Sequence, residues 1–129
     1  MTATVLCVDD DPLVLGVTRL ALERRGYRVL TASTGAEALS MLKQPGEEIA
    51  LVLLDWRLQD WDGEEVLLGM KRISPRVKVL VTSGDGSEAA LSSEAGGLAA
   101  GFLEKPYSPA QLLRSVQRLL GQETRTAAA

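Results

Sequence analysis

The hydrophobic pattern alternates along the chain between short apolar runs and longer stretches with helical spacing. Short runs occur at residues 4–8, 28–31, 49–54, 77–82 and 101–103, and we expect each to form a strand. The run at 49–54 is aliphatic at nearly every position, which is typical of a strand covered by helices on both faces. The pattern therefore predicts a parallel sheet buried between two helical layers.

Five stretches between or after these runs have helical signals. The first begins at Pro12, behind a capping aspartate at position 10 or 11, and ends near Gly26. Its apolar residues at helical spacing are Leu13, Val14, Val17, Leu20 and Ala21. The second follows a Ser-Thr cap and ends at Pro45-Gly46. The remaining three cover residues 63–73, 87–94 (a weaker signal) and 109–120.

Strands that alternate with helices predict an α/β fold with right-handed crossovers. We expect a doubly wound, flavodoxin-like parallel sheet of five strands in the order 2-1-3-4-5, with five helices. Residues 1–121 would form one domain and residues 122–129 a flexible tail.

Composition narrows the chemistry. The net charge of −3 argues mildly against a direct nucleic-acid binder, and no apolar stretch is long enough to span a bilayer. With no secretory signal pattern either, we expect a cytoplasmic protein with no membrane partner. The single cysteine, Cys7, lies in an apolar run and is expected in the core. The absence of histidine excludes metal sites and general bases that use it.

Polar side chains follow several of the predicted strands. In a doubly wound sheet, ligands bind outside the carboxyl ends of the strands, near the point where the strand order reverses. The residues expected at this edge are Asp9, Asp10, Asp55, Thr82, Ser83 and Lys105. Three close carboxylates repel one another, and a hard divalent cation relieves this repulsion. Oxygen ligands favour Mg²⁺, with Mn²⁺ or Ca²⁺ less specifically indicated.

An ammonium group, a hydroxyl group and a metal ion together suit a phosphoryl group. A carboxylate can attack phosphorus and form an acyl phosphate, which is covalent catalysis by aspartate. Lys105, Ser83 and the metal would each stabilise charge on the phosphoryl oxygens.

Four motifs carry a resemblance to a known family: "VDDD" at residues 8–11, "LLDWRLQDWDG" at 53–63, "VTSG" at 81–84 and "LEKPYS" at 103–108. In this order and spacing they resemble the receiver domain of two-component response regulators, of the chemotaxis-regulator type. The resemblance implies that Asp55 is the phosphoacceptor and that Asp9 and Asp10 hold Mg²⁺. It also makes the backbone carbonyl of Arg57 a further metal ligand.

The same resemblance assigns four more roles. It implies that Ser83 contacts the phosphoryl group and that Lys105 pairs with it, with Pro106 after a cis bond. Phe102 lies where the family keeps an aromatic residue that turns inward on activation. The domain would catalyse only its own phosphorylation and dephosphorylation, so it is a signalling domain and not an enzyme.

The resemblance also implies partners. A sensor histidine kinase or phosphotransfer protein would supply the phosphoryl group. The fourth helix, fifth strand and fifth helix would form the switching surface, through which a homodimer is also an option. The cognate kinase and the output stay open, and so does the choice between a free-standing regulator and a receiver from a longer chain such as a hybrid histidine kinase.

Three alternatives compete with this interpretation. A haloacid-dehalogenase-like phosphatase needs a second acid two residues after its nucleophilic aspartate, and this chain has Arg57 there. A nucleotide or flavin module would be indicated by "GxGxxG" or "GxxxxGK[ST]", and neither motif is present. A receiver that only serves as a docking platform is disfavoured by the intact acids, Ser83 and Lys105.

Arg57 and Asp85 occupy the two positions that, in this family, tune how long the phosphoryl group persists. An Arg57–Asp85 pair across the site would exclude water from the acyl phosphate. We therefore expect Arg57→Asn to speed the loss of the phosphoryl group. The dephosphorylation rates of the purified wild-type and variant proteins would test this. An unchanged rate would contradict this hypothesis.

Overall fold

The structure is a computed structural model, and it describes residues 2–46, 48–58, 60, 62–84 and 97–121. In order, the described elements are β1 (Thr4–Val8), α1 (Pro12–Glu23), β2 (Arg28–Ala32), α2 (Gly35–Leu42), β3 (Ile49–Asp55), α3 (Gly63–Ile73), β4 (Lys78–Ser83), β5 (Gly101–Glu104) and α5 (Pro109–Leu119). The helix expected at residues 87–94 and the tail expected at 122–129 lie outside these residues.

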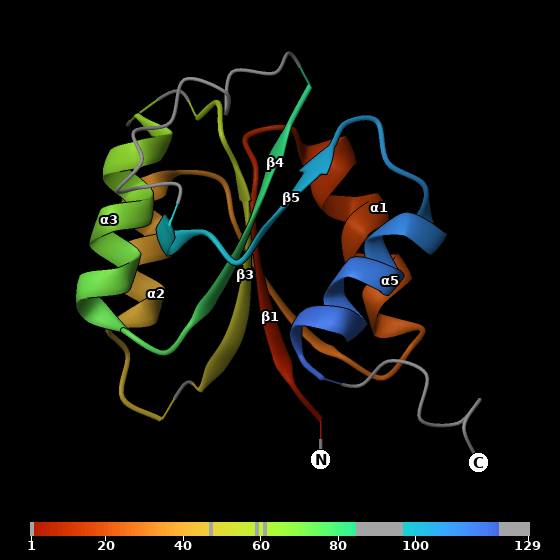
Figure 1. Cartoon of the computed structure of the whole chain (residues 1–129), viewed down its shortest axis with the longest axis horizontal. Helices are drawn as coiled ribbons and strands as arrows, with labels where there is room; N and C mark the ends of the chain where they lie inside the picture. The colour runs from red at the N-terminus through yellow and green to blue at the C-terminus, as the bar shows by residue number, and fades with distance from the viewer. Residues whose placement is uncertain (1, 47, 59, 61, 85–96, 122–129) are drawn as a thin grey trace.

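All five strands are parallel and form one sheet in the order β2-β1-β3-β4-β5, which confirms the predicted topology. Helices α1 and α5 lie on one face of the sheet, and α2 and α3 lie on the other (Figure 1). The strand order reverses between β1 and β3, so the predicted edge for a ligand lies beyond the ends of these two strands.

The central strand β3 contributes to two separate cores. Val52 and Leu54 pack in the core under α2 and α3, whereas Leu51 and Leu53 pack in the core next to α1 and α5. Successive side chains of a strand point to opposite faces, so a strand between two helical layers needs apolar residues at every position. This requirement explains the continuous aliphatic run and gives Asp55, its last residue, a rigid base.

Aspartate side chains cap the starts of α1 and α3. The side chain of Asp11 accepts the Leu13 N–H at 2.9 Å and is the N-cap of α1, which decides between the two candidate aspartates. Asp62 caps α3 in the same way, accepting the Glu64 N–H at 3.2 Å. None of the helices in the described residues has the length and apolar character that crossing a bilayer requires.

Several of the regularly spaced apolar residues of α1 lie on its exposed side. Leu13, Val17 and Leu20 are 76%, 61% and 52% exposed, and we call these three residues the α1 stripe. The buried positions of the helix are instead Thr18 and Leu22. Helical spacing therefore identified the helix correctly but did not identify its inner face.

Two leucines of α1 provide a matched test of this arrangement. Leu22 is fully buried, so Leu22→Ala should lower the free energy of unfolding by about 2–4 kcal/mol, through lost burial and the cavity left behind. Leu20→Ala, two residues away, should change it by less than about 0.5 kcal/mol. Urea denaturation of both variants measures the difference, and equal losses would contradict the assigned face.

Candidate metal and phosphoryl site

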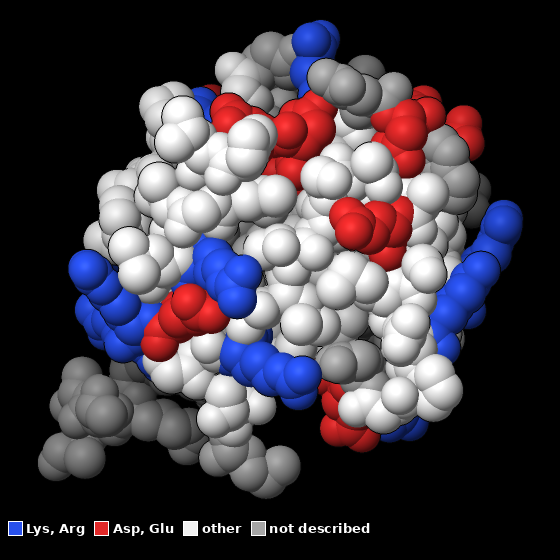
Figure 2. Space-filling model, turned by 180° about the vertical axis from the view of Figure 1, so that it is seen from behind, with Lys and Arg blue, Asp and Glu red and all other residues white. Residues whose placement is uncertain are grey.

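Three aspartates meet at the carboxyl ends of neighbouring strands. Asp9 and Asp10 follow β1, and Asp55 is the last residue of β3, which pairs with β1 in parallel. One carboxylate oxygen from each of the three lies within 4.8 Å of the others. Asp9 and Asp55 are only 5% and 6% exposed, while Asp10 is half-buried. Acidic side chains gather at the same end of the molecule in the opposite view, at the top of Figure 2.

Lys105 brings a positive charge into this group from the other side. Its Nζ donates to Asp9 Oδ2 at 2.7 Å and lies 3.4 Å from Asp55 Oδ1. Its backbone N–H donates to the Ser83 carbonyl at 2.8 Å, which fixes the start of the loop after β5. The following Lys105–Pro106 bond is cis, as expected. The lysine is thus held beside two of the three acids.

The charges in this group are not balanced. Burial, and then the negative charge of Asp9, raise the pKa of Asp55 to about 6, although Lys105 and the Arg57 N–H act in the opposite direction. Burial alone would lower the pKa of Lys105, but its hydrogen bond to Asp9 and the two nearby carboxylates raise it. Lys105 therefore stays protonated, and the site still carries more negative charge than it can compensate.

A hard divalent cation fits this donor set. Three carboxylates at close range offer oxygen ligands, and the raised pKa of Asp55 shows that added positive charge would be favourable. Mg²⁺ prefers a small number of carboxylates together with waters, which suits a site that is open through the half-buried Asp10. The acid cluster is therefore consistent with Mg²⁺, as the sequence indicated.

The remaining predicted residues lie in different surroundings. Ser83 is 3% exposed and lies one residue beyond Thr82, which pairs with Asp55 between β3 and β4. The Arg57 N–H donates to Asp55 Oδ1 at 3.3 Å, so the loop after β3 turns back over the acceptor. Phe102 is 46% exposed on β5. Asp85 lies outside the described residues.

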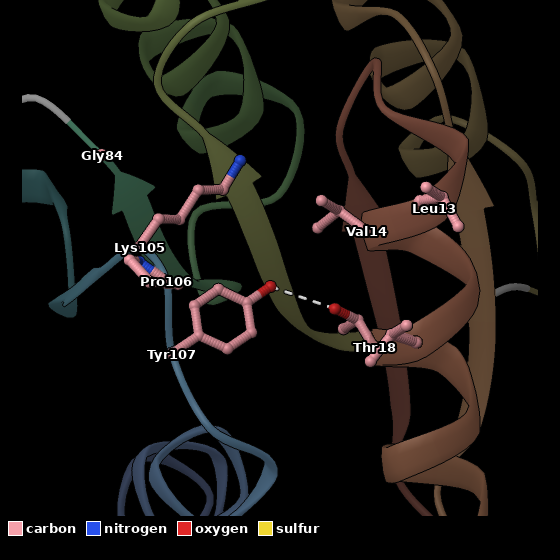
Figure 3. A pocket seen from close by; sticks show the side chains of 8 residues that line it. Leu13, Val14, Thr18, Gly84, Lys105, Pro106 and Tyr107 are labelled. Atoms are coloured by element: carbon pink, nitrogen blue, oxygen red, sulfur yellow. Dashed lines mark hydrogen bonds between the residues drawn. The ribbon is translucent and has the colours of Figure 1, made fainter.

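A cavity beside the lysine was not expected from the sequence. It has a volume of about 600 Å³, opens between α1 and the loop after β5, and is lined by Leu13, Val14, Val17, Thr18, Gly84, Lys105, Pro106 and Tyr107. The hydroxyl groups of Tyr107 and Thr18 form a 3.0 Å hydrogen bond across its floor (Figure 3). The "KPY" segment at residues 105–107 forms one wall of the cavity and α1 forms the other. The hydrophobic pattern of the sequence does not predict that these two segments face each other.

Comparison with known proteins identifies the arrangement. The profile of the response regulator receiver domain family matches residues 5–117. The chain belongs to this family. The receiver assignment made from the four motifs is therefore confirmed. The receiver is a phosphoryl-accepting signalling domain, so the phosphatase alternative is excluded.

Relatives of this receiver occur in proteins of different kinds. It is 34% identical over 95% of its length to a part of sensor kinase CckA from Brucella abortus, and 34% identical over 95% to a part of the transcriptional regulatory protein KdpE from Mycobacterium tuberculosis. The receiver spans 13% and 53% of those two chains. Among solved structures, a response regulator receiver domain protein from Methanospirillum hungatei has a TM-score of 0.80 at 30% identity, with 96% and 98% of the two chains covered.

The raised pKa of Asp55 has a consequence for stability without metal. The folded protein binds this proton more tightly than the unfolded chain, whose carboxyl titrates near 4. The stabilising contribution is complete below pH 4 and is lost as the pH rises through about 6. In magnesium-free buffer at pH 7.5, Asp55→Asn should therefore raise the free energy of unfolding by on the order of 2 kcal/mol.

The gain should shrink towards zero between pH 6 and pH 4, and urea denaturation across this range measures it. Glu104→Gln, which removes an exposed acid near the same lysine, is the control and should show no such trend. A gain from Asp55→Asn that is constant from pH 4 to pH 8 would contradict the assigned titration.

Proposed function

We propose that this receiver accepts a phosphoryl group on Asp55 from a phosphohistidine of a sensor histidine kinase or phosphotransfer protein. The observation that carries this proposal is the surrounding of Asp55, a buried carboxylate at the end of the central strand with two further acids and Lys105 against it. We also propose that residues 1–121 form the receiver domain and that the protein acts in the cytoplasm.

The receiver's own part in the chemical step comes from groups at this edge of the sheet. An Asp55 carboxylate oxygen attacks phosphorus, so an O–P bond forms and an acyl phosphate results. The N–P bond of the phosphohistidine breaks, and its electron pair stays on the imidazole nitrogen. Lys105 Nζ, 3.4 Å from the acceptor, stabilises negative charge on the phosphoryl oxygens, and Ser83 donates its hydroxyl hydrogen to one of them.

We assign the metal to Asp9, Asp10, Asp55 and the backbone carbonyl of Arg57. Mg²⁺ bound there would neutralise charge on the acids and on the phosphoryl oxygens, and Mn²⁺ or Ca²⁺ could substitute. The Asp9 side chain also accepts the Asp11 N–H at 2.9 Å and the Lys105 ammonium at 2.7 Å. These two bonds fix the orientation of the Asp9 carboxylate.

The α1 stripe supports a position for the donor protein. Leu13 and Val17 are exposed and line the cavity whose far wall is Lys105 and Tyr107. Large exposed apolar side chains next to each other are typical of contact surfaces. A donor whose apolar side chains cover this stripe would be placed at the same edge of the sheet as Asp55.

The proposal also includes an output surface. Phosphorylation would shift the equilibrium of a surface formed by the fourth helix, β5 and α5, with Phe102 as its switch residue. The helix in this set lies outside the described residues. Sedimentation with and without beryllium fluoride and Mg²⁺ would show whether activation produces a homodimer.

Intact mass after incubation with acetyl phosphate and Mg²⁺ tests the acceptor. Wild type should gain one phosphoryl group and Asp55→Asn none, because an amide is not a nucleophile for this reaction. Glu104→Gln, an exposed acid next to Lys105, is the matched control and should be labelled like wild type. Wild type that takes no label would support the docking-platform alternative instead.

Val17→Glu tests the position of the donor. The residue is 61% exposed, so the protein should fold normally and react with acetyl phosphate at the wild-type rate. Transfer from a histidine kinase that phosphorylates the wild-type chain should slow by about tenfold, equivalent to about 1.4 kcal/mol of lost contact.

The control is Ser40→Glu, which adds the same charge on the exposed side of α2. It should leave both reactions unchanged. Equal slowing by Val17→Glu and Ser40→Glu, or none by either, would place the donor elsewhere.

A further inference from the structure

The loop between β3 and α3 is fastened at its tip to a different helix. Asp60 lies in this loop, and its Oδ1 accepts the Gly35 N–H at 3.0 Å while its Oδ2 accepts the Ala36 N–H at 3.0 Å. Gly35 and Ala36 are the first two residues of α2, and they precede Asp60 by 25 and 24 positions. One carboxylate therefore joins the loop after the acceptor strand to the start of α2.

The contact has favourable chemistry. The first N–H groups of a helix have no partner within the helix, and they carry the positive end of its dipole. A carboxylate that accepts two of them makes charge-assisted hydrogen bonds, which are stronger than neutral ones. The third N–H, from Glu37, is taken by the Thr34 hydroxyl at 3.0 Å. Asp60 thus provides acceptors for the two N–H groups that Thr34 does not bind.

Close packing leaves this junction little freedom. A methyl group on Gly35 would lie 2.7 Å from Val66 Cγ2 of α3 and 3.5 Å from Asp60 Oδ1. At the base of the loop, a methyl group on Gly63 would lie 2.6 Å from the Trp56 carbonyl oxygen. Glycine therefore fits both positions best, because a larger residue would displace Val66 at one and Trp56 at the other.

The fastened loop leads directly to the acceptor. Arg57 and Asp62 form an antiparallel bridge that closes the loop, so a constraint at Asp60 acts on a short closed segment. Within that segment, the Arg57 N–H donates to Asp55 Oδ1 at 3.3 Å. A shift of the loop tip would therefore move the Arg57 backbone relative to the acceptor carboxylate.

We propose that Asp60 is a positioning residue for the phosphoryl-accepting site. By binding the start of α2, its carboxylate holds the loop so that the Arg57 backbone stays against Asp55, with the Arg57 carbonyl placed for metal. This inference rests on the proposed function only for the role of that carbonyl. Residues that orient metal ligands from behind commonly contribute 10- to 100-fold in metal affinity, and we expect about tenfold here.

The test is calorimetric titration of Mg²⁺ into wild type, Asp60→Ala, Asp60→Asn and Glu37→Gln. Asp60→Ala should raise the dissociation constant of Mg²⁺ by about tenfold. Asp60→Asn keeps one acceptor oxygen and should have a smaller effect. Glu37→Gln is the matched control, because it removes a charge from the same helix start and leaves the loop contact in place. It should bind Mg²⁺ like wild type.

Two further measurements separate positioning from a general loss of stability. Amide hydrogen exchange should be faster at Gly35 and Ala36 in the Asp60 variants, and the Arg57 amide resonance should shift. Acetyl phosphate labelling should be slow at low Mg²⁺ but return to the wild-type rate at saturating Mg²⁺. A lower free energy of unfolding with unchanged Mg²⁺ affinity would overturn the proposal.

Each remaining outcome also decides the question. If Asp60→Ala does not fold, Asp60→Asn takes its place, and wild-type Mg²⁺ binding by that variant despite faster exchange at Gly35 would overturn the proposal. If wild type binds Mg²⁺ but takes no phosphoryl group, the proposed function fails. The Mg²⁺ affinities of the variants would still decide the role of Asp60.

Discussion

The structure depends on keeping a carboxylate buried at the end of a central strand while other acids lie against it. Asp55 is 6% exposed and its pKa is raised to about 6, so its ionised form is costly without added positive charge. Lys105 supplies part of that charge and is itself fixed, by Asp9 and by the Ser83 carbonyl. The residual negative charge suits the site to a divalent cation, which the proposed phosphoryl transfer would use.

The parallel sheet makes this arrangement possible with few residues. Parallel strands end at the same edge, so residues 46 positions apart, Asp9 and Asp55, become neighbours through the β1–β3 pairing. The two helical layers require β3 to be apolar up to its last residue, and this rigid base limits the movement of the acceptor. The same continuous burial that stabilises the fold therefore also orients the carboxylate.

Much of this could be predicted from the sequence, because strand runs and strand-end acids are local signals. The alternation of strands and helices indicated the doubly wound arrangement, whose usual strand order the structure has, and in that order Asp9, Asp10 and Asp55 meet at one edge. The inner face of α1 could not be predicted, because helical spacing fits either side when apolar residues surround the helix. The cavity and the Asp60 contact depend on distant segments meeting, for which the sequence has no periodic signal.

The exposed residues of α1 and the fastened loop after β3 differ in how they relate to stability. Asp60 satisfies two helix N–H groups, so its contact favours the fold as well as the site. The α1 stripe does not stabilise the fold in this way, because Leu13 and Val17 leave apolar surface in water. Burying that surface against another molecule would be favourable. Neighbouring exposed apolar side chains of this kind are typical of contact surfaces, which agrees with the proposed docking of a donor protein here. Because these two line the cavity next to Lys105, that molecule would meet the receiver beside its acceptor rather than at a remote face.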